Sequence, residues 1–118
     1  MKELEIEKIG EWADSLVAGE EILLNGYLYT ARDAVHKKFA SLVAEGKPLP
    51  IDVRGAVIYY AGPTPSKNGM AVGSCGPTTS SRMDKHTPML LDMGLGGIIG
   101  KGERNEAVIE SIKKNKSV

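Results

Sequence analysis

The stretch Val53-Arg54-Gly55-Ala56-Val57-Ile58-Tyr59-Tyr60-Ala61 decides the fold of this chain. It is rich in apolar, β-branched and aromatic residues, and Gly62-Pro63-Thr64-Pro65 follows it directly. A short apolar run that is bounded by glycine and proline is typical of a buried strand, so we predict the strongest strand of the chain here. The prolines set its end, because each one removes a backbone donor and restricts the residue before it.

A second strand and a helix are predicted before this stretch. Residues 20–29 carry apolar side chains of one parity, which indicates a strand (Ile22, Leu24 and Leu28). Thr30 is a suitable N-cap for a following helix, and Asp33 stands three residues later, as in a capping box with Asp in place of Glu. An apolar stripe predicts that this helix runs to Gly46, which ends it (Ala34, Val35, Phe39, Leu42 and Val43).

Further elements are predicted after the central strand. Residues 70–74 indicate a strand, and Thr79 or Ser80 can cap a helix that starts near Met83. Pro88 breaks or restarts this helix, so we expect two short helices before residue 94. The apolar residues 95–99 then predict a buried strand and residues 103–114 a final amphipathic helix. Because strands and helices are interspersed, we predict one α/β domain over residues 1–118.

The composition argues against several classes of protein. Lys plus Arg and Asp plus Glu both number 15, so no overall field favours nucleic acid or an anionic membrane as a partner. With one Phe and one Trp, the chain offers little for stacking on single-stranded bases. No run of 18 apolar residues predicts a membrane span, and the first residues lack the apolar region of a secretory signal. We therefore expect a cytoplasmic protein with neither a nucleic-acid nor a membrane partner.

The single cysteine, Cys75, limits the redox and metal chemistry of the chain. It cannot form an internal disulfide, and it favours a reducing compartment weakly. Iron–sulfur clusters need several thiolates, so this chain cannot hold one by itself. His36 and His86 lack metal-ligand spacing, and we predict a surface or structural role for both and no metal site here. Cys75 itself is predicted to be a small packed side chain.

Two arginines are predicted to lie at helix N-termini, where the helix dipole disfavours cations. Arg32 and Arg82 each fall in the first turn of a predicted helix, an end that favours anions by a few tenths to about 1 kcal/mol. Free N–H groups and a guanidinium at this end can bind a carboxylate or phosphate. Alternatively, each arginine pairs with a neighbouring acid, Asp33 or Asp84. Either interpretation suits one arginine alone, but the two together favour an anion site.

Two turns of small residues can also approach a ligand. Residues 76–82, Gly-Pro-Thr-Thr-Ser-Ser-Arg, offer backbone N–H groups and four hydroxyls, whereas a capped turn needs only one hydroxyl. Gly100-Lys101-Gly102 combines a point charge with a backbone that a ligand can reach, although a surface turn is an alternative. Neither this turn nor the glycines around Leu95 fit a nucleotide-binding motif.

Four motifs in this order resemble those of one known family. They are residues 30–36 (TARDAVH), 59–63 (YYAGP), 76–84 (GPTTSSRMD) and 99–102 (IGKG). They resemble the C-terminal domain, or separate β subunit, of class I fumarate hydratases and L-tartrate dehydratases, from about residue 15 onward. Members of the family usually continue with an apolar strand and a helical segment, whereas this chain stops at Val118. We therefore expect a domain that lacks the usual C-terminal extension.

The resemblance implies a swivelling β/β/α domain that works with a larger α subunit. In the family, that partner holds a [4Fe–4S] cluster through three cysteines, and the cluster's open iron acts as a Lewis acid on the substrate. By motif position, Thr78 corresponds to the catalytic threonine, and Arg32, Arg82 and Lys101 correspond to the cations that bind the substrate carboxylates.

The implied function is that of a β subunit of a hydro-lyase. It would add water to, or remove it from, a C4 dicarboxylate (fumarate and malate, or tartrate to oxaloacetate). The implied assembly contains two α and two β chains, and the β chain alone is expected to be inactive. The alternative is a non-catalytic module that binds small carboxylate anions with the same cations.

Overall fold

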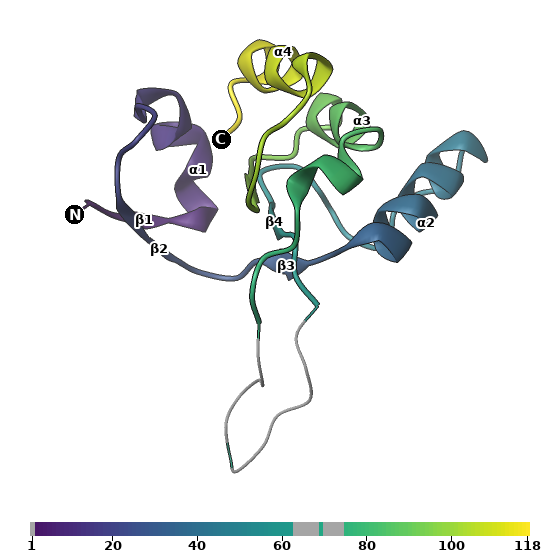
Figure 1. The fold of residues 1–118 in the computed structure, drawn as a ribbon, viewed down its shortest axis with the longest axis horizontal. Coiled ribbons are helices and arrows are strands. Elements are labelled where there is room, and N and C mark those ends of the chain that lie inside the picture. Colours follow the sequence, from purple (N-terminus) through teal and green to yellow (C-terminus); the bar gives the residue numbers. More distant parts are fainter. Residues whose placement is uncertain (1, 63–68, 70–74) are drawn as a thin grey trace.

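Strand β4 (Val57–Tyr59) forms the centre of the main sheet and lies within the predicted central strand. It pairs in parallel with β3 (Tyr29–Thr30) on one side and β5 (Gly97–Ile99) on the other. The structure, a computed structural model, describes residues 2–62, 69 and 75–118 (Figure 1). The strand predicted at residues 70–74 lies outside these described residues.

The predicted strand over residues 20–29 is divided between two sheets. Its first part is β2 (Ile22–Asn25), which pairs in parallel with β1 (Lys2–Glu5), and its second part is β3. The division falls at Gly26, which has a φ of 127° and whose absent Cβ would lie 3.2 Å from the Cβ of Ile6. A prediction of one continuous strand was therefore wrong, because glycine both permits this turn and makes room for Ile6.

Three short helical segments connect β1 to β2. They are η1 (Ile6–Lys8), α1 (Ile9–Trp12) and η2 (Ala13–Ser15). Together with the β1–β2 sheet, they form the purple part of the chain at one side of the main sheet (Figure 1). Neither β1 nor the three helical segments were predicted from the sequence, whereas β2 is part of the predicted strand.

Helix α2 (Asp33–Ala44) begins two residues later than predicted, because its N-cap is Arg32 and not Thr30. The N–H of Ala31 donates to the carbonyl of Tyr59 at 3.0 Å, so pairing with β4 keeps the chain extended past Thr30. Arg32 is the N-cap, and its side chain makes no capping hydrogen bond. The predicted end is confirmed, because Gly46 has a φ of 71° and its N–H donates to the carbonyl of Val43.

Two short helices precede residue 94, as predicted. They are η3 (Ser80–Met83) and α3 (Thr87–Asp92), with proline in the first turn of α3. The predicted start near Met83 was wrong, because η3 begins within the hydroxyl-rich turn at Ser80 and ends at Met83. The final helix, α4 (Glu106–Asn115), begins after Asn105, whose side-chain oxygen accepts the N–H of Val108 at 2.9 Å. Helices α3 and α4 lie side by side (Figure 1).

Both faces of β4 are buried, and each contributes to a different core. Val57 packs with residues of α1 and its neighbours, whereas Ile58 packs with residues of α2 and α3. The sheet therefore lies between the N-terminal segment and helices α2 to α4, which makes the chain one α/β domain with parallel strands (Figure 1). The larger core contains Ala31, Phe39, Val53, Ile58, Tyr60, Met83, Leu90, Leu91 and Leu95. Among the described helices, none has the length and apolar character needed to cross a bilayer.

Candidate functional site

The carboxyl ends of β3, β4 and β5 meet at one edge of the main sheet, because the three strands are parallel. Arg32 follows β3, Gly62 follows β4 and Lys101 follows β5. Ligands of open parallel sheets bind outside this edge. The topology therefore places three of the sequence motifs at the edge where a ligand is expected.

The hydroxyl-rich turn joins the same edge by extending the backbone pairing. The N–H of Thr78 donates to the carbonyl of Tyr60 at 2.7 Å, and the N–H of Ser80 donates to the carbonyl of Lys101 at 2.8 Å. Thr79 forms a parallel bridge with Lys101. The turn thus lies between the continuations of β4 and β5, and it brings Thr78 to the motifs of the other strands.

Arg82 connects this turn to helix α2. Its Nη1 donates to Thr78 Oγ1 at 3.2 Å, and its Nη2 pairs with Asp33 Oδ2 at 2.5 Å. The side chains of Arg82 and Asp33 are 56% and 44% exposed, so a ligand can reach this pair from solvent. The alternative prediction, that each arginine pairs with an acid, is confirmed for Arg82. Its partner is Asp33 on α2 and not the neighbouring Asp84.

Arg32 lies on the other side of the α2 N-terminus, and its guanidinium packs directly against Gly62. A Cβ at Gly62 would overlap with Arg32 Nε and Cζ, so this approach requires glycine. A surface hollow of about 250 Å³ beside it is lined by Arg32, Thr30, Ala31, Ala34, Val35, Ala61 and Gly62. Within the described residues, no carboxylate lies at ion-pair distance from Arg32. Its charge is therefore available to an anionic ligand.

Lys101 is exposed in a turn that the two flanking glycines shape. A Cβ at Gly100 would overlap with Ser80 Oγ and lie 2.8 Å from Tyr60 Cδ2, and Gly102 has a φ of 86°. Lys101, too, has no ion-pair partner among the residues with described positions. The edge thus carries three cations, Arg32, Arg82 and Lys101, and Asp33 as an acid paired with one of them.

A buried polar network supports this edge, and sequence reasoning missed it. Arg104 Nε donates to Asp84 Oδ1 at 2.7 Å, and the N–H of Asn105 donates to Asp84 Oδ2 at 2.9 Å. The Arg104 Nη2 donates to Tyr60 Oη at 3.1 Å and to Thr87 Oγ1 at 2.8 Å. The network ties the segment after Lys101 to the segment after Arg82. No local spacing signals it, because Asp84 and Arg104 are 20 residues apart.

The two histidines differ in their surroundings. His36 is fully buried, its ring meets the Tyr60 ring edge-on at 5.2 Å, and neither ring nitrogen has a hydrogen-bond partner among the described residues. Burial, with a smaller contribution from His86, lowers the pKa of His36 to about 4. Burial and the charge of Lys85 lower the pKa of the half-buried His86. His36 is therefore a neutral packed residue at pH 7, which agrees with the structural role predicted for it.

The residues of this chain do not fit an iron–sulfur cluster. Cys75 is its one cysteine, and such clusters need several thiolates. Cys75 is half-buried, and its carbonyl accepts the Tyr59 hydroxyl at 2.8 Å. In the part of the chain that the structure describes, no three His, Cys, Asp or Glu side chains gather as a metal would require.

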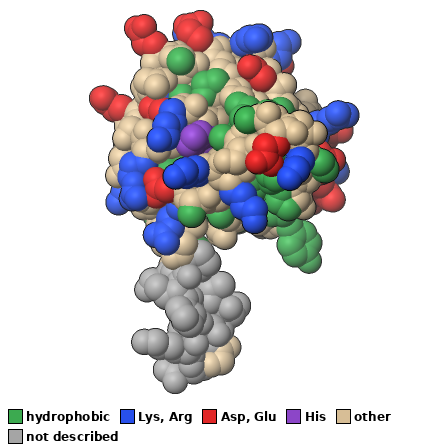
Figure 2. Space-filling model, turned by 90° about the vertical axis from the view of Figure 1, so that its right-hand side faces the viewer, with side chains coloured by type: hydrophobic (Ala, Val, Ile, Leu, Met, Phe, Trp, Pro, Cys, Tyr) green, Lys and Arg blue, Asp and Glu red, His purple; other side chains and the backbone are tan. Residues whose placement is uncertain are grey.

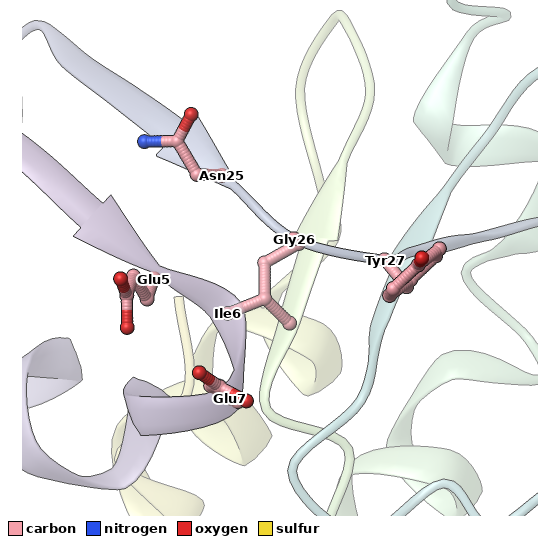
Figure 3. A pocket seen from close by; sticks show the side chains of 6 residues that line it. All are labelled: Glu5, Ile6, Glu7, Asn25, Gly26 and Tyr27. Carbon is pink, nitrogen blue, oxygen red and sulfur yellow. The ribbon is translucent and has the colours of Figure 1, made fainter.

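A larger hollow lies away from the edge, at the N-terminal sheet. It has a volume of about 310 Å³ and is lined by Glu5, Ile6, Glu7, Asn25, Gly26 and Tyr27 (Figure 3). Its charged side chains are carboxylates, which repel an anion. The hollow is therefore unsuited to an anionic ligand, whereas the cations at the sheet edge favour one.

Comparison with known proteins gives a consistent result. The family model described as Fumarase C-terminus matches residues 1–118. The chain is 37% identical over 111 residues to fumarate hydratase 2 of Leishmania major, which covers 93% of this chain and 20% of the relative. It is 39% identical over 93 residues to the aerobic class I fumarate hydratase of Escherichia coli strain K12 (78% of this chain, 17% of the relative).

A relative of different size also matches. The chain is 34% identical over 101 residues to a putative L(+)-tartrate dehydratase subunit beta of Methanocaldococcus jannaschii, which covers 83% of this chain and 52% of the relative. This chain thus spans about a fifth of the fumarate hydratases and about half of the separate subunit.

Proposed function

Because the chain belongs to the fumarase C-terminal family, we propose that it is the substrate-binding subunit of a hydro-lyase that acts on a C4 dicarboxylate. The substrate pair would be fumarate and malate, or tartrate and oxaloacetate. The observation that carries this proposal is that Arg32, Lys101 and the turn with Thr78 and Arg82 all lie at the carboxyl edge of the sheet, where Arg82 donates to Thr78.

The charge of this edge suits a dianion. Among the described residues of the edge, Arg32, Arg82 and Lys101 are the cations identified, and the acid Asp33 already pairs with Arg82. Arg82 uses one N–H toward Asp33 and one toward Thr78, so other guanidinium donors remain for a ligand. Arg32 can bind a carboxylate through two parallel hydrogen bonds, and Lys101 adds a mobile point charge. We therefore propose that Arg32, Arg82 and Lys101 hold the two substrate carboxylates.

The same cations would lower the barrier of the reaction. Removing a proton from the carbon next to a carboxylate moves negative charge onto that carboxylate. Fixed cations directed at it bind the transition state more strongly than the ground state. Removing one such donor commonly costs about 10²–10³ in kcat.

We propose Thr78 as the residue that carries the proton. An unassisted threonine hydroxyl is a poor acid or base near neutral pH. Here its oxygen accepts a hydrogen bond from the charged Arg82, which stabilises negative charge on that oxygen and leaves the hydroxyl proton free for another partner. Arg82 would thus assist Thr78 and bind substrate at once.

A partner would complete the enzyme. We propose an α subunit that supplies the [4Fe–4S] cluster, because the single cysteine of this chain cannot. Support comes from the relative named as a subunit beta and from fumarate hydratases of which this chain matches about a fifth. In this proposal the swivelling β/β/α domain closes over the partner in an assembly of two α and two β chains, and it is inactive alone.

Single substitutions in the assembled enzyme test the proposed roles. Arg82→Ala and Arg32→Ala should each lower kcat/KM by about 10²-fold, because each removes a cation from the developing charge. Lys38→Ala is the matched control, since Lys38 is an exposed lysine of α2 outside the edge, and it should leave turnover unchanged. Unchanged turnover in Arg82→Ala would contradict the assignment. Carboxylate binding without any turnover would favour the non-catalytic anion-binding module.

A further inference from the structure

A second group of cations surrounds a small hollow beside Arg82. The hollow has a volume of about 100 Å³ and lies between α2 and the turn that joins η3 to α3. Figure 2 shows the face of the molecule that carries α2, where Lys and Arg side chains gather around a histidine. Five residues line the hollow. Asp33 is an acid, and the other four can carry a positive charge (Lys37, Arg82, Lys85 and His86).

The two lysines of this hollow are unpaired in the described part of the chain. Lys37 stands one helical turn after Asp33 on α2, and Lys85 comes from the turn on the opposite side of the hollow. Both are exposed, and neither forms an ion pair with another described residue. The one acid, Asp33, is paired with Arg82. The hollow therefore has a net charge of +2 when His86 is neutral.

The pKa of His86, the histidine of the hollow, is affected by this charge. The positive charge of Lys85 adds to burial in lowering the pKa of His86. Like charges held together in this way repel one another, and a bound anion would remove that repulsion. It would also make available a half-buried imidazole as a further donor.

We infer that this hollow is a second anion site, which takes a compact dianion of the phosphate class between Lys37, Lys85 and His86. Its volume corresponds to about three water-sized groups, which suits a tetrahedral anion that stays partly open to solvent. Lys ammonium groups are common point-charge partners of phosphate. The site is distinct from the proposed carboxylate clamp, because Arg32, Thr78 and Lys101 do not line it.

The shared residue Arg82 couples the two sites. A dianion in the hollow places negative charge beside Arg82 and opposes a second anion on its other donors. In an assembled hydro-lyase, phosphate would therefore raise KM for the dicarboxylate. This coupling rests on the proposed function, whereas binding of the anion to the hollow does not.

The test is a titration of the 118-residue chain with inorganic phosphate at pH 7.5, with ionic strength held constant by NaCl. The ring protons of His86 are followed by NMR and assigned by their loss in His86→Gln. We expect a saturable shift with a dissociation constant in the millimolar range and a raised His86 pKa in the bound form. Lys37→Gln and Lys85→Gln should each weaken binding about three- to tenfold, and Lys38→Gln should not.

Two results would overturn the inference. One is the absence of a saturable shift at about 20 mM phosphate, some tenfold above the expected constant. The other is an equal loss of affinity in Lys38→Gln, which would mean that only the general charge of α2 is being screened. Because no turnover is measured, failure here leaves the proposed function untouched.

Discussion

Replacement of Asp84 by alanine should destabilise the domain strongly, because Asp84 holds the buried charge of Arg104. The two side chains are 9% and 14% exposed, and their closest N–O distance is 2.7 Å. In Asp84→Ala, the acceptors left to Arg104 among the described residues are two neutral hydroxyls, those of Tyr60 and Thr87, and the N–H of Asn105 loses its acceptor. Breaking a buried pair in this way costs about 3–5 kcal/mol, and the residual exposure favours the lower value.

A loss of about 3 kcal/mol corresponds to a fall in Tm of about 12 °C for a domain of this length, since unfolding entropy is roughly 2.1 cal/mol/K per residue. Urea and thermal unfolding followed by circular dichroism measure both quantities. The control is Asp92→Ala, because Asp92 is exposed and lies 3.7 Å from Lys114, and it should cost at most about 1 kcal/mol. Adding Arg104→Met to Asp84→Ala should restore part of the loss by removing the stranded charge. A cost below about 1 kcal/mol for Asp84→Ala, or no recovery in the double variant, would refute this reasoning.

Three other substitutions test the glycines and the buried histidine. Gly100→Ala should lower the free energy of unfolding in urea by about 1–3 kcal/mol, because the added Cβ would overlap neighbouring side chains. Gly10→Ala is the control and should be close to neutral, because its Cβ would meet no atom within 4 Å. Equal costs for the two variants would contradict the packing described for Gly100. The folded pKa of His36, about 4, lies below its ordinary value of 6.5, so the unfolded chain binds more protons between these values and stability falls as pH drops through that window. The loss reaches about 3 kcal/mol, and His36→Leu should remove it; an unchanged pH dependence would show that other groups titrate there. Gly62→Ala should displace Arg32 and raise KM for the dicarboxylate about tenfold or more with little change in Tm, and an unaltered KM would count against Arg32 in the clamp.

Local backbone signals in the sequence predicted several boundaries correctly. Gly46 ends α2, and Pro88 lies in the first turn of α3, where a second short helix was expected to start, because both residues act on their own backbone conformation. Boundaries that depend on distant residues were wrong. Thr30 does not cap α2, because pairing of Ala31 with Tyr59 holds it in β3. Gly26 divides the predicted strand because Ile6, 20 residues earlier, packs against it.

In the candidate site, too, local motifs were identified correctly, whereas contacts between distant residues were not. Motifs in the sequence identified Arg32, Thr78, Arg82 and Lys101, and the parallel strands bring them to one edge of the sheet. Their catalytic and binding roles stay predictions. The partners of these residues could not be found from spacing.

Those partners depend on the tertiary fold. Asp33 reaches Arg82 across 49 residues, and Asp84 reaches Arg104 across 20. The contact of α2 with η3 and the position of the segment before α4 create these pairs. A sequence pattern can therefore identify the cations, whereas the structure is needed to say which of them remain free for a ligand.

The most direct test of the account is anaerobic reconstitution. The chain is mixed with a cluster-loaded α subunit from the same source, and fumarate hydration and tartrate dehydration are followed, with each component alone as a control. We predict activity in the mixture alone, with one of the two substrates preferred. A stable complex that turns over neither substrate, or a mixture whose rate equals that of the α subunit by itself, would contradict the claim that this chain supplies the carboxylate clamp of a hydro-lyase.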